Sequence, residues 1–497
     1  MHPSALAKRV YVFIFLIIIA FYLYGLGQLP LLGPDEPRYA QVAREMFLTG
    51  DYITPTLGGY TWFEKPSLLY WMIAASFKVF GVSEWAARLG PALCGLLTIV
   101  AITFVGHEIK RGLSTLVVTA TCLGLIVFSR AASFDIVVTM TTTWALACFL
   151  LHELAGTGRG NSKSGRGACP RASDSGGKPP FLTCHYLIGF YLFVGLSLLA
   201  KGLVGVVISF GVVGAYYLLR RAWPERSVWV SLIWGVPLAL AVSAVWYGPV
   251  IAKHGWTFID EFFVQHHFAR YVSNKYHHPQ PIYFYPVIIL MLALPWTPFL
   301  VEALVKTRRW VWRDPDSLSV VRIFSLAWLV FPIVFFSFSG SKLPGYILPA
   351  LPAAALLIAD VLRPKKPAVL IAIACGTVVL VLIALTFFAG PYADRESVRD
   401  LIALGDARGY ANAPVIALKS DDRSAEFYAH DRVVYNSHGE VVTFDEISMS
   451  EARARGGKFL VLVPREYVEN FRSWGSIEVI GDNGKTAILG WKLGQDL

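Results

Sequence analysis

The sequence predicts a polytopic α-helical membrane protein that ends in a small α/β domain. Of its 497 residues, 55% are hydrophobic and only 16% are charged, and the mean hydropathy is +0.53. Soluble domains have roughly 25% charged residues, so the composition excludes an ordinary soluble protein. The net charge of +10 is spread over short loops between apolar runs, which argues against nucleic-acid binding.

Eleven apolar runs come close to the length of about 20 residues that a bilayer-spanning helix needs. The first run is followed by further spans and by no small-residue cleavage site, so we interpret it as a retained helix and not as a signal peptide. We expect about 11–13 transmembrane helices. The runs cover residues 10–27, 89–106, 113–129, 136–151, 184–200, 202–219, 228–250, 283–301, 323–339, 343–359 and 367–389.

The short basic loops predict the orientation of these spans. Lys8 and Arg9 precede the first run and place the N-terminus inside the cell, because basic residues are enriched in cytoplasmic loops. Alternation of the spans then places two long segments, 28–88 and 251–282, outside the cytoplasm. The same alternation brings every strongly basic short loop to the cytoplasmic side: Lys110/Arg111, 154–182, Arg220/Arg221/Arg226, Lys306/Arg308/Arg309/Arg313 and Arg363/Lys365/Lys366.

The chain divides into a transmembrane domain, residues 1–390, and an extracytoplasmic tail, residues 391–497. Loop 154–182 is rich in Gly, Ser, Lys and Arg, and we expect a disordered cytoplasmic linker there. The shorter apolar run 68–81 contains Lys78 and predicts a helix lying along the membrane interface. The tail alternates strand-like runs with charged stretches, which predicts a small α/β domain. Those strand-like runs are 415–418, 433–435, 459–463 and 487–489.

Several kinds of site are not expected. The chain carries no P-loop, nucleophile elbow or glycine-rich dinucleotide fingerprint, so no nucleotide cofactor is predicted. None of the six cysteines lies in a segment placed outside the cytoplasm, and none has the spacing of a zinc site. A disulfide framework is therefore not predicted.

Two motifs in segment 28–88 carry ionisable residues. Residues 33–40 read GPDEPRYA and residues 62–71 read WFEKPSLLYW. Taken alone, the first is compatible with a simple helix start, in which acidic residues and proline occupy the first turn. The second is compatible with an interfacial aromatic belt beside an exposed ion pair.

Together the motifs resemble the opening of the polyprenyl-phosphate-dependent GT-C glycosyltransferases, especially the aminoarabinose transferase and protein O-mannosyltransferase-like branch. In that family an Asp-Glu pair begins the first extracytoplasmic loop, and a Phe-Glu-Lys-Pro segment follows. Further similarity lies in residues 261–263 (EFF), 267–271 (HFARY) and 341–346 (SKLPGY). The resemblance covers roughly residues 10–360 and implies a GT-C type fold.

The chemistry outside the cytoplasm points to the same kind of donor. No pool of nucleotide sugars exists there, so a sugar must arrive on a lipid carrier with a phosphate at headgroup level. Breaking its glycosidic bond needs cations beside the leaving phosphate, where negative charge develops. Lys65 and Arg270 are suitably placed, with Arg38 a third candidate that can grip phosphate with two hydrogen bonds. The resemblance favours Lys65 and Arg270 and adds Tyr346 as a phosphate hydrogen-bond donor; we also place Glu36 among the substrate-binding residues.

Asp35 is the first candidate for a catalytic carboxylate, and Asp135 is the second. Asp135 begins a span at the outer face, where a helix cap is the simpler alternative. The role of Asp35 depends on the acceptor. A hydroxyl acceptor needs a general base, whereas a phosphate acceptor, with a second pKa near 6, is already ionised. In that case the carboxylate would position the sugar or balance charge.

Four histidines, His266, His267, His277 and His278, crowd the second outer segment. Surface histidines are mostly bystanders. A divalent ion, zinc or magnesium, held by Glu64 and His267 is a weaker hypothesis.

The predicted function is a glycosyltransferase of the bacterial inner membrane that uses a polyprenyl-phosphate donor, with inversion at the anomeric carbon. The acceptor is lipid A or another envelope glycolipid, and the sugar 4-amino-4-deoxy-L-arabinose is one option. Protein Ser/Thr hydroxyls are the alternative acceptor. A transporter or lipid flippase is disfavoured, because the sequence has no midplane charge and no obvious repeat. We expect a monomer surrounded by membrane lipids, without a nucleic-acid partner, and a tail that is dispensable for donor binding.

Overall fold

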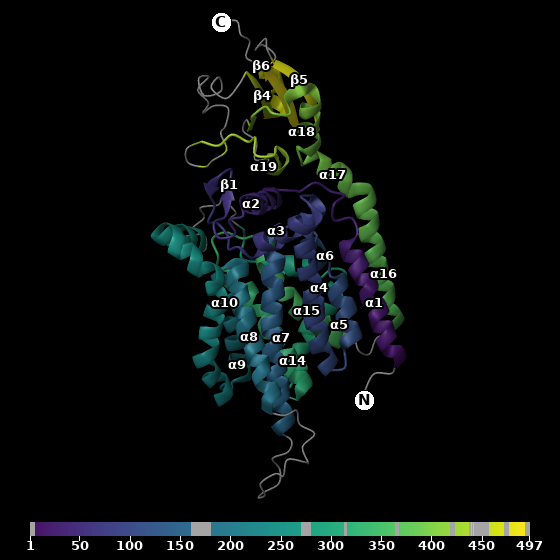
Figure 1. Cartoon of the computed structure of the whole chain (residues 1–497). Helices are drawn as coiled ribbons and strands as arrows, with labels where there is room; N and C mark the ends of the chain where they lie inside the picture. The colour runs from purple at the N-terminus through teal and green to yellow at the C-terminus, as the bar shows by residue number, and fades with distance from the viewer. Residues whose placement is uncertain are drawn as a thin grey trace, which may run out of the picture.

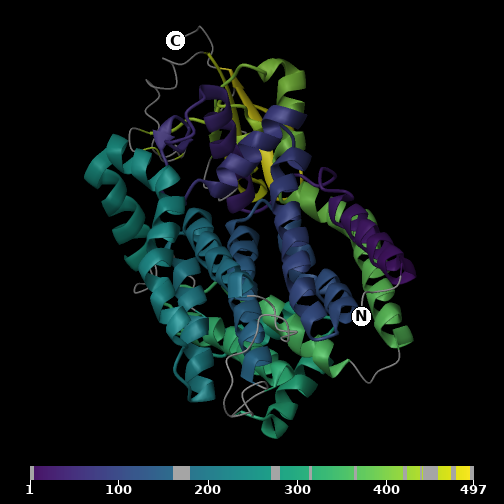
Figure 2. The ribbon, with the colours of Figure 1, turned by 60° about the horizontal axis from the view of Figure 1, so that its bottom comes forward.

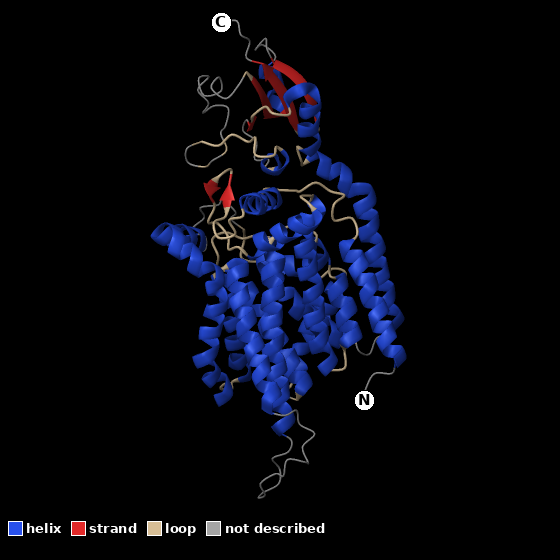
Figure 3. Cartoon of the chain, in the orientation of Figure 1, coloured by secondary structure: helices blue, strands red, loops and turns tan. Residues whose placement is uncertain are grey.

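The computed structural model describes residues 5–160, 180–269, 280–312, 316–362, 367–417, 423–436, 439, 441, 457–471 and 477–492. Long helices form a bundle, and a small sheet domain stands over one end of it (Figures 1 and 3). The bundle helices are α1 (Ala5–Leu23), α4 (Glu84–Glu108), α5 (Gly112–Thr121), α6 (Leu123–Ser129), α7 (Phe134–Gly160), α8 (Pro180–Lys201), α9 (Leu203–Arg220), α10 (Arg226–Ile259), α12 (Phe284–Leu292), α13 (Thr297–Val305), α14 (Ser317–Ser337), α15 (Leu351–Val361) and α16 (Pro367–Ile383).

The predicted spans correspond to these helices. Within the described residues, seven helices are long and apolar enough to cross a membrane, or eight when the bent pair α5–α6 counts as one span. Two of the remaining predicted runs fall on α1 and α8, whose described apolar parts are shorter than a full span. Another falls on α12 and α13, which are separated by a break. The chain is therefore a multi-pass membrane protein, with η3 (Pro344–Ala350) leading into α15.

Two broken spans meet at their breaks. The pair α5–α6 bends by 60° at Cys122, whose backbone is extended. The freed amide of Leu123 donates to the carbonyl of Leu294, between α12 and α13, at 2.8 Å. The indole of Trp296 donates to Thr121 Oγ1 at 3.0 Å. Each break thus satisfies polar groups of the other, as the interior of a membrane protein requires.

Segment 28–88 forms a cover over the tail-facing end of the bundle. It contains α2 (Asp35–Thr49), the hairpin β1 (Thr56–Leu57) and β2 (Tyr60–Thr61), and α3 (Leu68–Phe80), and Figure 1 shows these elements between the bundle and the tail. The apolar run expected to lie along the interface is α3. Glu45 of α2 holds the hairpin by accepting hydrogen bonds from Thr56 Oγ1 at 2.7 Å and from the Gly58 amide at 2.7 Å.

The tail continues from α16 through η4 (Ala384–Ala389) and α17 (Gly390–Arg395), with α1 and α16 running side by side along one edge of the bundle in both views (Figures 1 and 2). Its sheet has the order β3-β4-β6-β5, and β3 pairs parallel with β4 while the other pairs are antiparallel. The strands are β3 (Val415–Ala417), β4 (Lys458–Pro464), β5 (Ile477–Asp482) and β6 (Thr486–Lys492).

The α/β class of the tail is as predicted, but two details of its sheet differ. Strand β5 was not predicted, because its side chains are half exposed and lack a clear apolar run. The expected strand 433–435 provides only isolated bridges, Val415 to Val433 and Tyr435 to Val441.

The tail packs directly on the cover. Tyr428, at the end of α19 (Ser424–Tyr428), accepts a hydrogen bond from the Leu31 amide at 2.8 Å and donates to Glu84 Oε1 at 3.1 Å. Gly58 approaches the ring of Tyr435 so closely that a Cβ there would lie 2.2 Å from a ring carbon. The tail is therefore built into the same end of the molecule as the two sequence motifs.

Candidate functional site

Asp35, Arg38, Glu64 and Lys65 form one group of charges, which we call the α2 cluster. Arg38 donates to Asp35 Oδ1 at 2.7 Å and to the carbonyl of Pro34 at 2.7 Å. Its guanidinium also lies 3.9 Å from Glu64 Oε2 and over the ring of Trp62, 5.5 Å from the centroid. The Asp35 side chain is 51% exposed whereas that of Arg38 is 15% exposed. Arg38 is thus fixed from several sides, and Asp35 is open to a substrate.

Glu64 and Lys65 extend this cluster from the turn that precedes α3. Lys65 Nζ donates to Glu64 Oε1 at 2.6 Å, and both side chains are largely buried. Burial alone would lower the pKa of Arg38, but Glu64 and other neighbouring groups outweigh it and raise that pKa. Arg38 therefore remains cationic at any physiological pH. Beside it lies the ammonium of Lys65, which the carboxylate of Glu64 holds in place.

A second group, the α7 cluster, consists of Asp135, Lys201 and Tyr346. Asp135 lies in the first turn of α7 and forms a short ion pair with Lys201, the last residue of α8. The Lys201 ammonium lies 4.8 Å from the ring centroid of Tyr346, a distance suited to a cation–π contact. Gly345 packs closely against the same carboxylate, because a Cβ at this position would lie 2.1 Å from Asp135 Oδ2.

Sequence reasoning missed Lys201, although a signal was present. Lys201 alone separates the apolar runs 184–200 and 202–219, and alternation of the spans places this turn on the same side as segment 28–88. A lysine in such a turn needs a partner or a ligand. Its partner is Asp135, 66 positions away in the sequence.

Three aromatic rings join the two clusters. Tyr39 follows Arg38 on α2, Tyr70 lies on α3, and Phe134 precedes Asp135 on α7. The ring of Phe134 lies 4.8 Å from that of Tyr39 and 5.2 Å from that of Tyr70, edge to face in both cases. Both predicted carboxylates, Asp35 and Asp135, therefore lie at the same end of the bundle.

Glu36 has a different environment from the one expected for a substrate-binding residue. Its side chain is 9% exposed and pairs with Arg88 Nη2 at 2.8 Å. Its oxygens also accept from the amides of Leu32 at 2.9 Å and Ala132 at 2.7 Å. Because α2 turns this carboxylate into the protein, we correct its role: Glu36 fixes the loop before α2 to α4 and to the start of α7.

The second outer segment is described only in part. Arg270 lies outside the described residues, and His267 lies in η1 (Asp260–Ala269) with a side chain that is not described. Glu64, the other proposed metal ligand, has the cations of Lys65 and Arg38 beside it, which disfavours a divalent ion at that carboxylate. In the part of the chain that can be described, no group of three or more His, Cys, Asp or Glu side chains could hold a metal ion. The metal site at Glu64 and His267 stays a prediction.

The tail supplies a carboxylate that the sequence did not suggest. Glu426 of α19 is 2% exposed and accepts from Arg423 Nη1 at 3.1 Å. Burial raises its pKa, and the charges of Arg423 and Arg38 oppose that shift. A buried acid of the tail therefore acts electrostatically on Arg38 of the α2 cluster.

Comparison with known proteins identifies relatives. The family model described as dolichyl-phosphate-mannose-protein mannosyltransferase matches residues 64–163. The undecaprenyl phosphate-alpha-4-amino-4-deoxy-L-arabinose arabinosyl transferase of Aeromonas salmonicida is 30% identical over 362 residues, 71% of this chain and 60% of that protein. The enzyme of the same name from Pseudomonas aeruginosa PAO1 is 32% identical over 356 residues, 70% of this chain and 59% of that protein. The match thus spans about three fifths of the length of these relatives.

Solved structures share the fold. ArnT from Cupriavidus metallidurans bound to undecaprenyl phosphate superposes with a TM-score of 0.74 at 20% identity, covering 97% of this chain and 98% of that one. The oligosaccharyltransferase AglB from Archaeoglobus fulgidus gives a TM-score of 0.55 at 14% identity, over 93% of this chain and 70% of that one. The expected GT-C type fold, with its C-terminal α/β domain, and the predicted family resemblance are confirmed.

Proposed function

We propose that this chain, which resembles aminoarabinose transferases in sequence and ArnT in fold, is a polyprenyl-phosphate-dependent glycosyltransferase. The donor is undecaprenyl phosphate carrying 4-amino-4-deoxy-L-arabinose, and the acceptor is lipid A or a similar envelope glycolipid. The names of the relatives support the donor.

The observation that carries this proposal is the α2 cluster at the end of a membrane bundle. It places two cations, Lys65 and Arg38, beside an exposed carboxylate, Asp35. When the sugar leaves its carrier, negative charge grows on the carrier phosphate, and preorganised cations stabilise that charge. Lys65 supplies a compact ammonium and Arg38 a fork of N–H donors. Arg270 is a further candidate that stays a prediction.

Asp35 faces the acceptor side of this reaction. If the acceptor is a hydroxyl, Asp35 accepts its proton as the bond to the sugar forms. If the acceptor is a lipid A phosphate, that oxygen is already ionised near neutral pH, and Asp35 orients the incoming sugar. The α7 cluster lies next to this site through Phe134, and Tyr346 offers a hydroxyl to the carrier phosphate.

The family model over residues 64–163 supports a second candidate function, transfer of mannose to protein Ser/Thr hydroxyls. The two functions share the carrier phosphate and differ in sugar and acceptor. Mass spectrometry of envelope glycolipids from cells with and without the gene separates them. We expect an aminoarabinose mass increment on lipid A that disappears without the gene. Unchanged glycolipids together with loss of protein-linked hexose would establish the second function instead.

We also propose that the protein lies in the bacterial inner membrane with the N-terminus in the cytoplasm and the α2 cluster outside. The basic short loops support this orientation. A single cysteine introduced at Ser164 should be protected from a membrane-impermeant thiol reagent in intact spheroplasts. Labelling of that cysteine would show that the topology is the reverse of the one proposed. The α2 cluster would then lie in the cytoplasm, away from the acceptor.

A further inference from the structure

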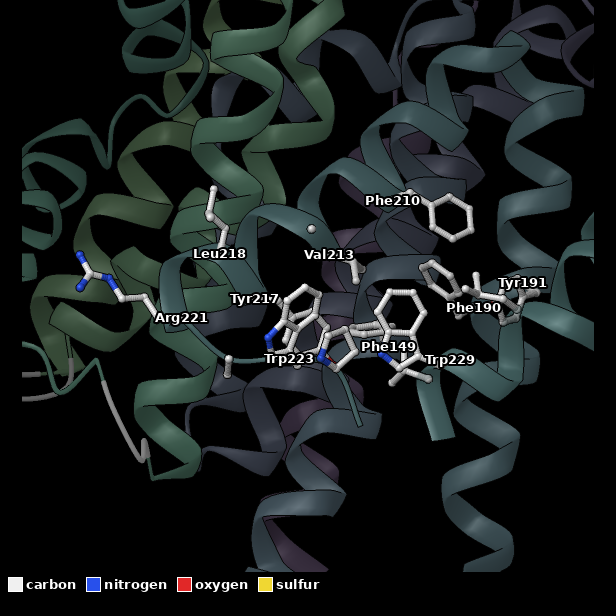
Figure 4. Close-up of a pocket in the computed structure, with 15 residues that line it drawn as sticks. Phe149, Phe190, Tyr191, Phe210, Val213, Tyr217, Leu218, Arg221, Trp223 and Trp229 are labelled. Atoms are coloured by element: carbon white, nitrogen blue, oxygen red, sulfur yellow. The ribbon is translucent and has the colours of Figure 1, made fainter. Parts of the chain in front are cut away.

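A cavity of about 630 Å³ lies at the end of the bundle away from the tail. It opens among α7, α8, α9 and α10, and aromatic side chains dominate its wall, including Phe149, Phe190, Tyr217 and Trp229 (Figure 4). Along α9 the lining begins at Phe210, nine positions after Lys201, and continues to Leu218. At 1.5 Å per residue this corresponds to about 14–26 Å from Lys201 along the helix axis. The nearest part of the cavity is therefore separated from Lys201 by about half the thickness of a bilayer core, and its far part by most of that thickness.

A buried charge network forms one side of the cavity and is internally balanced. Glu153 accepts from Tyr216 at 2.9 Å, from Tyr217 at 2.7 Å and from Arg220 at 3.2 Å. Tyr217 also lines the cavity. Because Arg220 neutralises Glu153, this network fixes the wall of the cavity without presenting a net charge to it.

Arg221, at the edge of the lining (Figure 4), has no such partner. It is exposed, and no carboxylate of the described residues lies within 4.0 Å of its guanidinium, although exposed Glu225 and Arg226 follow in the same connection. Arg221 also caps α9 in the left-handed region, with φ 51° and ψ 41°, where glycine is ordinarily preferred.

The surroundings identify the class of ligand. An apolar wall in a membrane bundle suits a hydrocarbon chain, and the volume lies within the range of about 300–1,000 Å³ typical of small-molecule sites. Trp223 is 87% exposed and Trp229 is 50% exposed, as expected for aromatic residues at headgroup depth. Basic pockets between transmembrane helices on the cytoplasmic side characteristically bind anionic lipid headgroups.

We propose that this cavity binds an anionic phospholipid of the cytoplasmic leaflet, with an acyl chain among the aromatic side chains and the phosphate against Arg221. The orientation proposed above determines only which leaflet supplies the lipid. Lipid binding here does not depend on glycosyl transfer and can be measured without any sugar donor.

Two pairs of matched variants test the proposal. Gly214 lines the cavity, and a Cβ there would meet no atom within 4 Å, so Gly214→Trp fills the cavity without a backbone clash. Gly248 on α10 is equally open but does not line the cavity, so Gly248→Trp is its control. Arg221→Gln removes the proposed phosphate contact, and Arg226→Gln removes a neighbouring exposed charge outside the lining.

The measurement is native mass spectrometry of the purified full chain after exchange with vesicles of phosphatidylcholine containing phosphatidylglycerol. We expect Gly214→Trp to weaken retention of phosphatidylglycerol at least tenfold. Arg221→Gln should abolish the preference over phosphatidylcholine, and both controls should behave as wild type. Equal retention by all five proteins would overturn the proposal. Displacement of the phospholipid by undecaprenyl phosphate at equal concentration would overturn it in favour of a carrier-lipid site.

Discussion

The α2 and α7 clusters each pair an aspartate with a cation, yet their environments differ. Asp35 is 51% exposed and its partner Arg38 is held by other groups, whereas Asp135 is 19% exposed and locked to Lys201. Separating a largely buried pair leaves an uncompensated charge and is costly. An exposed carboxylate can exchange its partner for a substrate at little cost. We therefore propose Asp35 as the reacting carboxylate and Asp135 as a positioning residue.

The largest effect is expected from Lys65→Ala in the α2 cluster. We propose that the Lys65 ammonium lies beside the carrier phosphate, where charge grows as the glycosidic bond breaks. Both donor affinity and single-turnover rate should fall, the rate by about 10²–10³-fold, as for loss of one preorganised donor. Lys65→Arg should restore only part of the rate, because a planar fork replaces a compact charge.

Lys78→Ala is the matched control for this variant. Lys78 is exposed at the far end of α3. Its replacement by Ala should leave donor affinity and single-turnover rate unchanged. Normal donor binding and normal turnover in Lys65→Ala would remove the α2 cluster from the reaction.

Asp35→Asn should affect turnover while leaving donor binding and thermal stability intact. The change keeps shape, removes charge, and affects a half-exposed side chain. With a hydroxyl acceptor the rate should fall by about 10²–10⁴-fold, the contribution of a general base. With a phosphate acceptor the loss should be smaller and nearly independent of pH between about 7 and 9, since that acceptor is already ionised. If Asp35→Asn lowers thermal stability but leaves the rate unchanged, Asp35 is the positioning carboxylate and Asp135 the reacting one.

Gly345→Ala probes the α7 cluster without changing any charge. The added Cβ would lie 2.1 Å from Asp135 Oδ2, so the Asp135–Lys201 pair must shift. We expect a lower melting temperature, corresponding to about 1–3 kcal/mol of overpacking strain, and a several-fold slower rate. Gly376→Ala on α16, where a Cβ meets nothing within 4 Å, should be neutral in both measurements. A rate loss as large as that of Asp35→Asn would make Asp135 a direct participant.

The smallest effect concerns Glu426, which links the tail to Arg38. Burial raises the pKa of Glu426 above its ordinary value of 4.5, so the folded state binds this proton more tightly than the unfolded chain. Wild-type stability should therefore fall as pH rises from about 4.5 through the raised pKa. Glu426→Gln lacks this proton linkage, so its melting temperature should improve relative to wild type as pH increases.

Thermal unfolding of both proteins between pH 4.5 and 8 measures this difference, with Glu478→Gln, an exposed site of the same domain, as control. A Gln variant that becomes steadily less stable than wild type with increasing pH would show that the ion pair with Arg423 and the nearby charge of Arg38 outweigh burial. The tail would then be held to the α2 cluster mainly by charge.

The spans, the cover and the motifs follow from local sequence patterns alone. A bilayer imposes a minimum apolar length on each span, so composition along the chain was sufficient to locate the bundle helices and α3. Asp35, Arg38, Glu64 and Lys65 lie within 31 consecutive residues, so one short segment brings them together. The α/β class of the tail followed from its alternating runs for the same local reason.

Which charged residues come into contact depends on the packing of helices and domains. Adjacent residues Asp35 and Glu36 point to solvent and to Arg88 respectively, because a helix turns neighbouring side chains about 100° apart and only packing decides which face is buried. Lys201 reaches Asp135 across 66 positions, and Glu426 lies near Arg38 because α19 of the tail packs on α2. Such pairs depend on how helices and domains dock, and local sequence patterns carry no record of that docking.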